Sequence, residues 1–177
     1  MGKQRTALRA PGIPLIALAI ALAGCGADAP SGESLRPAAV GPAVTLGEGV
    51  DGGLLWRYVV YRTLDGYCDV VDLASEPDRP VGGNCAGFGR GLNFSQRSES
   101  ERPSFVTGSV KSEAHRLLIE TRFDGVIETN AIEPPEALGL PFDVFVVALP
   151  EGSTIVGISA VDVEGQVVDE YDSGLSP

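Results

Sequence analysis

The chain has 177 residues and a formal net charge of −11, because 24 acidic residues oppose 13 lysines and arginines. This length suits one domain with appendages. An acidic surface repels nucleic-acid phosphates and anionic headgroups, so we expect no nucleic-acid partner and no adsorption to a bilayer through a basic face.

The N-terminus has the pattern of an export signal. Residues 1–9 contain Lys3, Arg5 and Arg9 and no acidic residue, and the run from Ile13 to Ala23 is apolar. A short apolar run after a basic segment is typical of a signal peptide. As a helix the run would rise only about 16 Å, against a hydrocarbon core of about 30 Å, which is too short for an ordinary membrane span. Without these three positive charges the remainder carries −14.

The apolar run ends in Leu22-Ala23-Gly24-Cys25. These four residues resemble the lipobox of bacterial lipoproteins. The resemblance implies that the Cys25 thiol carries a diacylglyceryl group and that the lipoprotein signal peptidase cuts between Gly24 and Cys25; acylation of the freed amino group is left open. We therefore expect a signal peptide over residues 1–24 and a protein held by lipid on the extracytoplasmic face of the cell membrane. The alternative is an ordinary Cys25 beside a simple cleavage site.

The segment that follows Cys25 has the composition of a linker. From Gly26 to about Gly53 it is rich in Ala, Pro, Gly and Ser, and no hydrophobic period is sustained. Such segments are typically flexible, so we expect lipidated Cys25 and a linker over residues 25–53, before a folded domain at 54–177. A random coil of about 25 residues spans roughly 25–30 Å, which would lift the domain clear of the headgroups. A strand at Ala43 to Leu46 is the alternative.

The domain itself shows the pattern of antiparallel strands. Aromatic and β-branched runs alternate with turn signals such as Asp65-Gly66 and Asp124-Gly125. The run from Phe142 to Leu149 is almost wholly apolar, which predicts a central strand covered on both faces. About eight strands are expected, over residues 54–63, 67–73, 105–110, 116–123, 126–130, 142–149, 154–163 and 167–171.

This pattern predicts an all-β antiparallel sandwich, with an immunoglobulin-like architecture preferred. The Cys…Trp…Cys order of true immunoglobulin domains is absent, because Trp56 precedes both cysteines of the domain. Residues 90–103 are expected to form a charged loop. Any helix should be short, around residues 95–102 or 135–138.

Two cysteines remain once Cys25 is assigned to the anchor. Export would place Cys68 and Cys85 in an oxidising space, where they are expected to form a disulfide. The bond would close a loop that contains two prolines and two adjacent glycines, and we expect that loop to lack regular structure. Two reduced, buried thiols are the alternative.

Residues with catalytic or metal-binding potential are few. His115 is the only histidine, and no serine has the surroundings of a nucleophile elbow, so we interpret His115 as a strand-end residue. No catalytic residue, cofactor or metal site is predicted with support. The weak candidates for calcium are five clustered carboxylates, those of Asp162, Glu164, Asp169, Glu170 and Asp172.

These observations favour a lipid-anchored envelope or surface protein whose sandwich binds a partner protein, a wall polymer or a small ligand. The alternative is an enzyme or enzyme accessory domain with a carboxylate-based site. Such a site would be a deep pocket with two facing carboxylates whose pKa values are raised.

Overall fold

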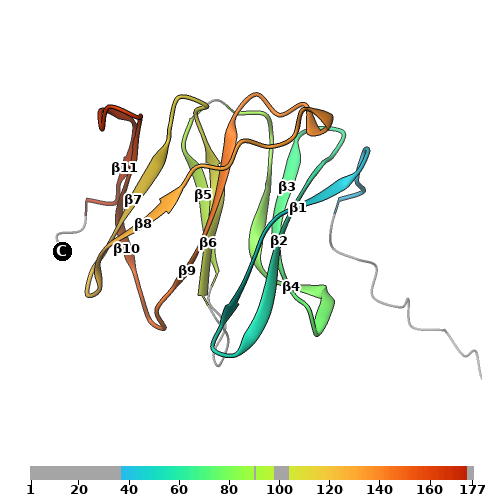
Figure 1. Cartoon of the computed structure of the whole chain (residues 1–177), viewed down its shortest axis with the longest axis horizontal. Helices are drawn as coiled ribbons and strands as arrows, with labels where there is room; N and C mark the ends of the chain where they lie inside the picture. The colour runs from blue at the N-terminus through green and yellow to red at the C-terminus, as the bar shows by residue number, and fades with distance from the viewer. Residues whose placement is uncertain (1–36, 90, 98–103, 175–177) are drawn as a thin grey trace, which may run out of the picture. The chain divides into compact units, whose positions relative to one another are not determined.

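The computed structural model describes residues 37–89, 91–97 and 104–174 (Figure 1). The described residues form eleven strands and one 3-10 turn. In chain order these are β1 (Ala43–Asp51), β2 (Leu54–Arg62), β3 (Tyr67–Leu73), β4 (Glu76–Ala86), β5 (Asn93–Arg97), β6 (Ser104–Val110), β7 (Arg116–Thr121), β8 (Gly125–Asn130), η1 (Glu136–Leu138), β9 (Asp143–Leu149), β10 (Ile155–Val161) and β11 (Val167–Asp172). No helix in these ranges has the length and apolarity needed to cross a bilayer.

The strands form three antiparallel sheets. The first has the order β1-β2-β3-β4, the second β5-β6-β9 and the third β11-β10-β7-β8. All pairs are antiparallel, and the register places Cys68 opposite Cys85 and Val106 opposite Val147. The first sheet is a meander, in which each strand pairs with the next along the chain.

The three sheets pack as three layers, with β5-β6-β9 between the other two (Figure 1). Side chains alternate between the two faces of a strand. Phe105 and Val144 therefore point into a core shared with the first sheet, whereas Val106 and Phe145 point into a core shared with the third. Every residue of β6 is buried, as expected for a strand covered on both sides.

The fold prediction is confirmed as an all-β antiparallel sandwich. The predicted range for β3 matches the observed strand, and the observed strands over 54–62, 104–110, 116–121, 125–130, 143–149, 155–161 and 167–172 lie within two residues of their predicted bounds at each end. The prediction that 142–149 is covered on both faces holds for β9, because its two faces contact different cores, but β9 is an edge strand of its sheet and not a central one. The short turn at Glu136–Leu138 is also observed. The immunoglobulin-like arrangement is not confirmed, because the strands form three sheets and the first is a sequential meander.

Three segments that were expected to lack regular structure are strands. Residues 43–51, assigned to the linker, form β1 and pair with β2 along its length. The disulfide loop contains β4, and the charged loop contains β5, where a short helix was the alternative. The folded body therefore begins before Leu54, and its first described strand starts at Ala43. The remainder of the predicted charged loop, at 90 and 98–103, lies outside the described residues.

Candidate functional site

A groove opens on the outer face of the third sheet. Its volume is about 540 Å³, and strands β7, β8, β10 and β11 all contribute to it. We call it the sheet groove; it is lined by Leu118, Glu120, Val126, Val156, Gly157, Ser159, Glu170, Tyr171, Asp172 and Gly174.

The register of the sheet explains why this face is hollow. Gly157 pairs with Glu120 on one side and with Asp172 on the other, and Ser159 pairs in the same way with Leu118 and Glu170. Paired residues of antiparallel strands project from the same face. The middle strand therefore contributes one hydrogen and one short hydroxymethyl group, while its neighbours contribute long side chains. The sheet groove therefore has β10 as its floor and the side chains of β7 and β11 as its sides.

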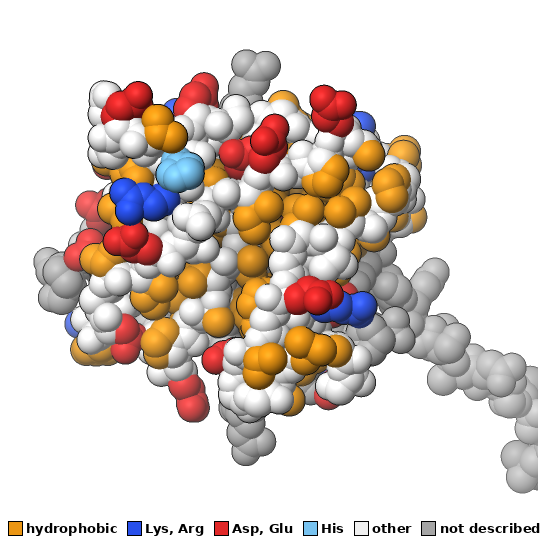
Figure 2. All heavy atoms as spheres, viewed as in Figure 1, with side chains coloured by type: hydrophobic (Ala, Val, Ile, Leu, Met, Phe, Trp, Pro, Cys, Tyr) orange, Lys and Arg blue, Asp and Glu red, His pale blue; other side chains and the backbone are white. Residues whose placement is uncertain are grey.

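The sides of the sheet groove are acidic. Glu120, Glu170 and Asp172 belong to its lining, and none of the described lining residues is basic. A carboxylate oxygen of Glu120 would lie 3.6 Å from a Cβ atom on Gly157, so this group leans over the floor. Figure 2 shows acidic side chains spread across the visible face of the molecule, with basic side chains in fewer places. The chemistry of the sheet groove therefore favours a cationic group over an anionic one.

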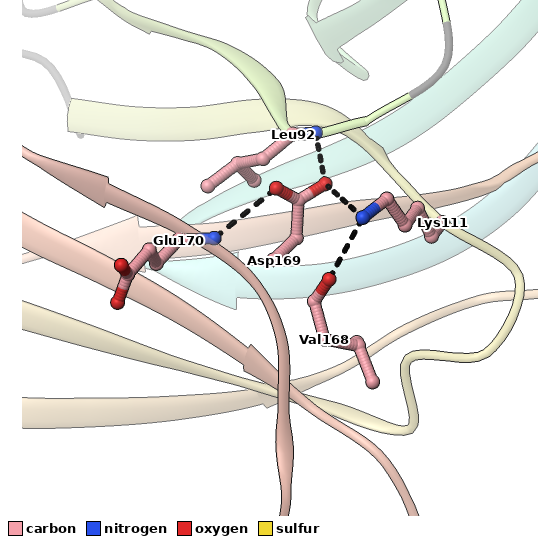
Figure 3. A network of polar contacts seen from close by, with 5 residues as sticks. All are labelled: Leu92, Lys111, Val168, Asp169 and Glu170. Carbon is pink, nitrogen blue, oxygen red and sulfur yellow. Dashed lines mark hydrogen bonds and ion pairs between the residues drawn. The ribbon is translucent and has the colours of Figure 1, made fainter.

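The calcium hypothesis is not supported by the positions of its carboxylates. Asp169 belongs to a network of polar contacts with residues far away in the sequence (Figure 3). The N–H of Leu92 donates to its Oδ2 at 2.7 Å, and the Lys111 ammonium lies 3.9 Å from the same atom while donating to the carbonyl of Val168 at 2.9 Å. Asp169 thus binds β11 to the start of β5 and to the turn before β7.

The other calcium candidates also have local roles. Oδ1 of Asp162 accepts hydrogen bonds from the N–H groups of Glu164 and Gln166, which closes the β10–β11 turn. Oδ1 of Asp172 accepts from the N–H of Gly174. Within the described ranges no three acidic, histidine or cysteine side chains gather closely enough to hold a metal ion. Glu170 and Asp172 are instead part of the sheet groove.

The remaining predicted residues fall in three places. Cys68 and Cys85 form a disulfide across the paired strands β3 and β4, with their Cα atoms 4.1 Å apart. His115 directly precedes β7; its N–H donates to Val161 and its carbonyl accepts from Ala131, which agrees with a strand-end residue. Gly24 and Cys25 lie outside the described residues.

A buried carboxylate that sequence reasoning missed lies between the first and second sheets. The Asp69 side chain is fully buried, and its Oδ1 accepts from the N–H of Asn84 at 2.7 Å and from the Thr107 hydroxyl at 3.3 Å. The Tyr58 hydroxyl donates to Oδ2 at 3.4 Å. Burial raises the pKa of Asp69 to about 6, against the lowering effect of these hydrogen bonds. The sequence signal was the presence of acids, Asp69 and Asp72, inside a strand whose other residues are apolar or aromatic.

The raised pKa of Asp69 predicts a pH-dependent stability. The unfolded chain releases this proton near pH 3.8 and the folded chain near pH 6. Below about pH 4 the Asp69 carboxyl is protonated in both states, and its ionisation does not reduce the free energy of unfolding. As the pH rises through 6, ionisation of the buried group lowers that free energy by up to about 3 kcal/mol. Replacing Asp69 with Asn should flatten the free energy of unfolding between pH 4 and 6, measured by urea titration at each pH. The exposed Glu164→Gln variant is the control, and an Asp69→Asn profile parallel to wild type would contradict the assignment.

Comparison with known proteins returned no match to a protein family, to a curated protein or to a solved structure. The function proposed below therefore rests on the residues and the geometry of this chain alone.

Proposed function

We propose that this chain is a lipid-anchored protein of the bacterial envelope whose sandwich is a binding module. The N-terminal charge pattern, the short apolar run and the four residues ending at Cys25 support the anchor. The Cys68–Cys85 disulfide supports export, though not the lipid itself, since such bonds persist in oxidising compartments outside the cytoplasm.

The observation that carries the binding role is the sheet groove. It is a concave surface with apolar side chains, Leu118 and Val126, beside three carboxylates. Its lining is more polar than that of a typical small-molecule pocket, which suits a partner that carries charged groups. The buried Asp69 does not suit the carboxylate-based chemistry of an enzyme, because its side chain is enclosed between two layers. The sheet groove is proposed to hold a partner through cationic groups, either on a protein or on a wall polymer.

Two kinds of variant test this role. Replacing Gly157 with Thr places a side chain on the floor, and a Cβ atom there meets only ordinary contacts, of which the nearest is 3.5 Å from the carbonyl oxygen of Tyr171. Glu120→Gln combined with Glu170→Gln removes charge and keeps shape. Both should reduce crosslinking of the native, membrane-held protein to its partner several-fold. The charge variant should lose most at low ionic strength, because salt screens exposed charges.

The matched control for the charge variant is Glu164→Gln, which removes a carboxylate at the tip of the β10–β11 turn. It should leave the crosslinked species unchanged. If the same partner is captured equally by wild type, Gly157→Thr and the double Gln variant, the sheet groove is not the binding surface.

A further inference from the structure

The structure places three exposed apolar side chains at one end of the first sheet. Val40 is 48% exposed, Leu64 is 85% exposed and Phe88 is 38% exposed. Two of them contact Arg62: the N–H of Val40 donates to the Arg62 carbonyl at 2.7 Å, and the Arg62 guanidinium lies 5.2 Å from the centre of the Phe88 ring. Leu64 lies in the β2–β3 turn, two residues after Arg62. We call Val40, Leu64 and Phe88 the apolar rim.

A second feature joins the apolar rim to the place where the chain enters the domain. A cavity of about 330 Å³ lies there, lined by residues of the entering chain, of the β2–β3 turn and of the end of β4. Pro37 and Ala38 are among its lining residues, together with Leu64 and Ala86. The apolar rim is thus at the end of the domain from which the N-terminal segment leaves.

The length of that segment limits the distance of this end from the anchor. Pro37 is twelve residues after Cys25, so the connection reaches at most about 43 Å when fully extended. A coil of this length would span only about 20 Å on average. The opposite end of the first sheet, at the β1–β2 turn, is further from Pro37 by the length of β2, about 30 Å. An anchor on Cys25 would therefore favour the apolar rim over the β1–β2 turn for contact with the bilayer.

We propose that the apolar rim inserts into the interfacial region of the membrane that carries the anchor. The inference rests on the proposed lipidation of Cys25. Exposed apolar side chains gain free energy when they enter the acyl boundary, and a short tether raises their effective concentration there. The charges nearby do not favour anionic lipid, since Asp65 lies beside Leu64 in the lining of the cavity, and the whole chain is acidic. Docking is therefore apolar and occurs on zwitterionic lipid.

The test uses the full-length, lipidated protein in phosphatidylcholine vesicles. Leu64→Cys adds one free thiol for an environment-sensitive fluorophore, because Cys68 and Cys85 are bonded. Leu55→Cys is the matched control, since Leu55 is 49% exposed on β2 near the β1–β2 turn. Spin-labelled lipids with the quencher deep in the acyl chain should quench the label at residue 64 several-fold more than the label at residue 55.

Further measurements separate insertion from its alternatives. Quenching at residue 64 by headgroup-labelled lipid alone would show proximity without insertion and would overturn the proposal. A label on Val40→Cys should lose its deep quenching when Leu64 and Phe88 are both replaced by Ser; unchanged quenching would also overturn it. If the apolar rim instead binds a second copy, the protein should be dimeric in detergent and unquenched in vesicles. Failure of the anchor itself is distinguishable, because the protein would then not float with vesicles at all.

Discussion

Replacing Cys25 with Ser should abolish the incorporation of radiolabelled fatty acid or glycerol into the protein. The thioether requires sulfur at this position, and the lipobox resemblance implies that lipidation precedes cleavage. We expect the variant to accumulate uncleaved or to appear in the soluble fraction. Several fatty chains on one residue hold a protein stably on a membrane, and the Cys25→Ser variant carries no such chain. Labelling and fractionation of cells that express each form measure both effects.

Cys68→Ser is the matched control for this experiment, since it removes a sulfur atom from the folded domain and leaves the anchor. It should be labelled as strongly as wild type. Undiminished labelling and undiminished membrane association of Cys25→Ser would contradict the assignment of the anchor.

Removing the disulfide should lower the free energy of unfolding by about 3 kcal/mol, because the unfolded chain regains the freedom of a loop of nearly 20 residues. The bond joins β3 to β4, so it prevents the edge strand β4 from separating from the rest of the first sheet. The double variant Cys68→Ala and Cys85→Ala avoids leaving a free thiol. Urea unfolding monitored through Trp56, which packs against Phe105 at 5.5 Å between ring centres, provides the measurement.

Reductant supplies the control for this prediction. It should destabilise wild type by a similar amount and should leave the double Ala variant unaffected. Equal stability of wild type and the double variant would show that the bond adds nothing, and equal intact masses before and after reduction would show that the thiols are free in the exported protein.

Strands with a sustained apolar or alternating pattern, between clear turn signals, were the predictable part of the fold. β3 and β9 are apolar over most of their length, and the turn signal at Asp65-Gly66 marks the boundary between β2 and β3. These features depend on local residue type, and a pair such as Asp-Gly is enough to indicate a tight turn between two strands. The strands that escaped prediction are β1, β4 and β5, and each is an edge strand of its sheet.

The edge strands β8, β9 and β11 were predicted, so the position at an edge alone does not explain why β1, β4 and β5 were missed. The residue composition that edge strands permit explains it. Edge strands tolerate proline, glycine and charge, because one side of the backbone needs no partner. β4 contains Pro77 and Pro80, and Gly83 has a φ of 118° in close approach to the backbone of Asp69. β1 contains Gly47 beside a bulge. Such residues have the composition of a linker, and only pairing with an apolar neighbour makes them strands.

The candidate site was predictable only in fragments. Glu170 and Asp172 were singled out as clustered carboxylates, but the sheet groove depends on the register of four strands, and Gly157 has no local signal of its own. The weak calcium candidates are close in sequence, but the hydrogen bonds of their carboxylates go to separate places. Asp169 is held by Lys111, a residue 58 positions earlier in the chain. Pairing between distant strands decides such contacts.

The most direct test of the proposed envelope protein is the intact mass of the mature polypeptide extracted from membranes, with fragmentation of its N-terminus. We expect the chain to begin at Cys25, to carry a diacylglyceryl group on that residue and to contain the Cys68–Cys85 bond. A mature chain that begins at any other residue, or that begins at Cys25 without lipid, would contradict both the anchor and the membrane docking that depends on it.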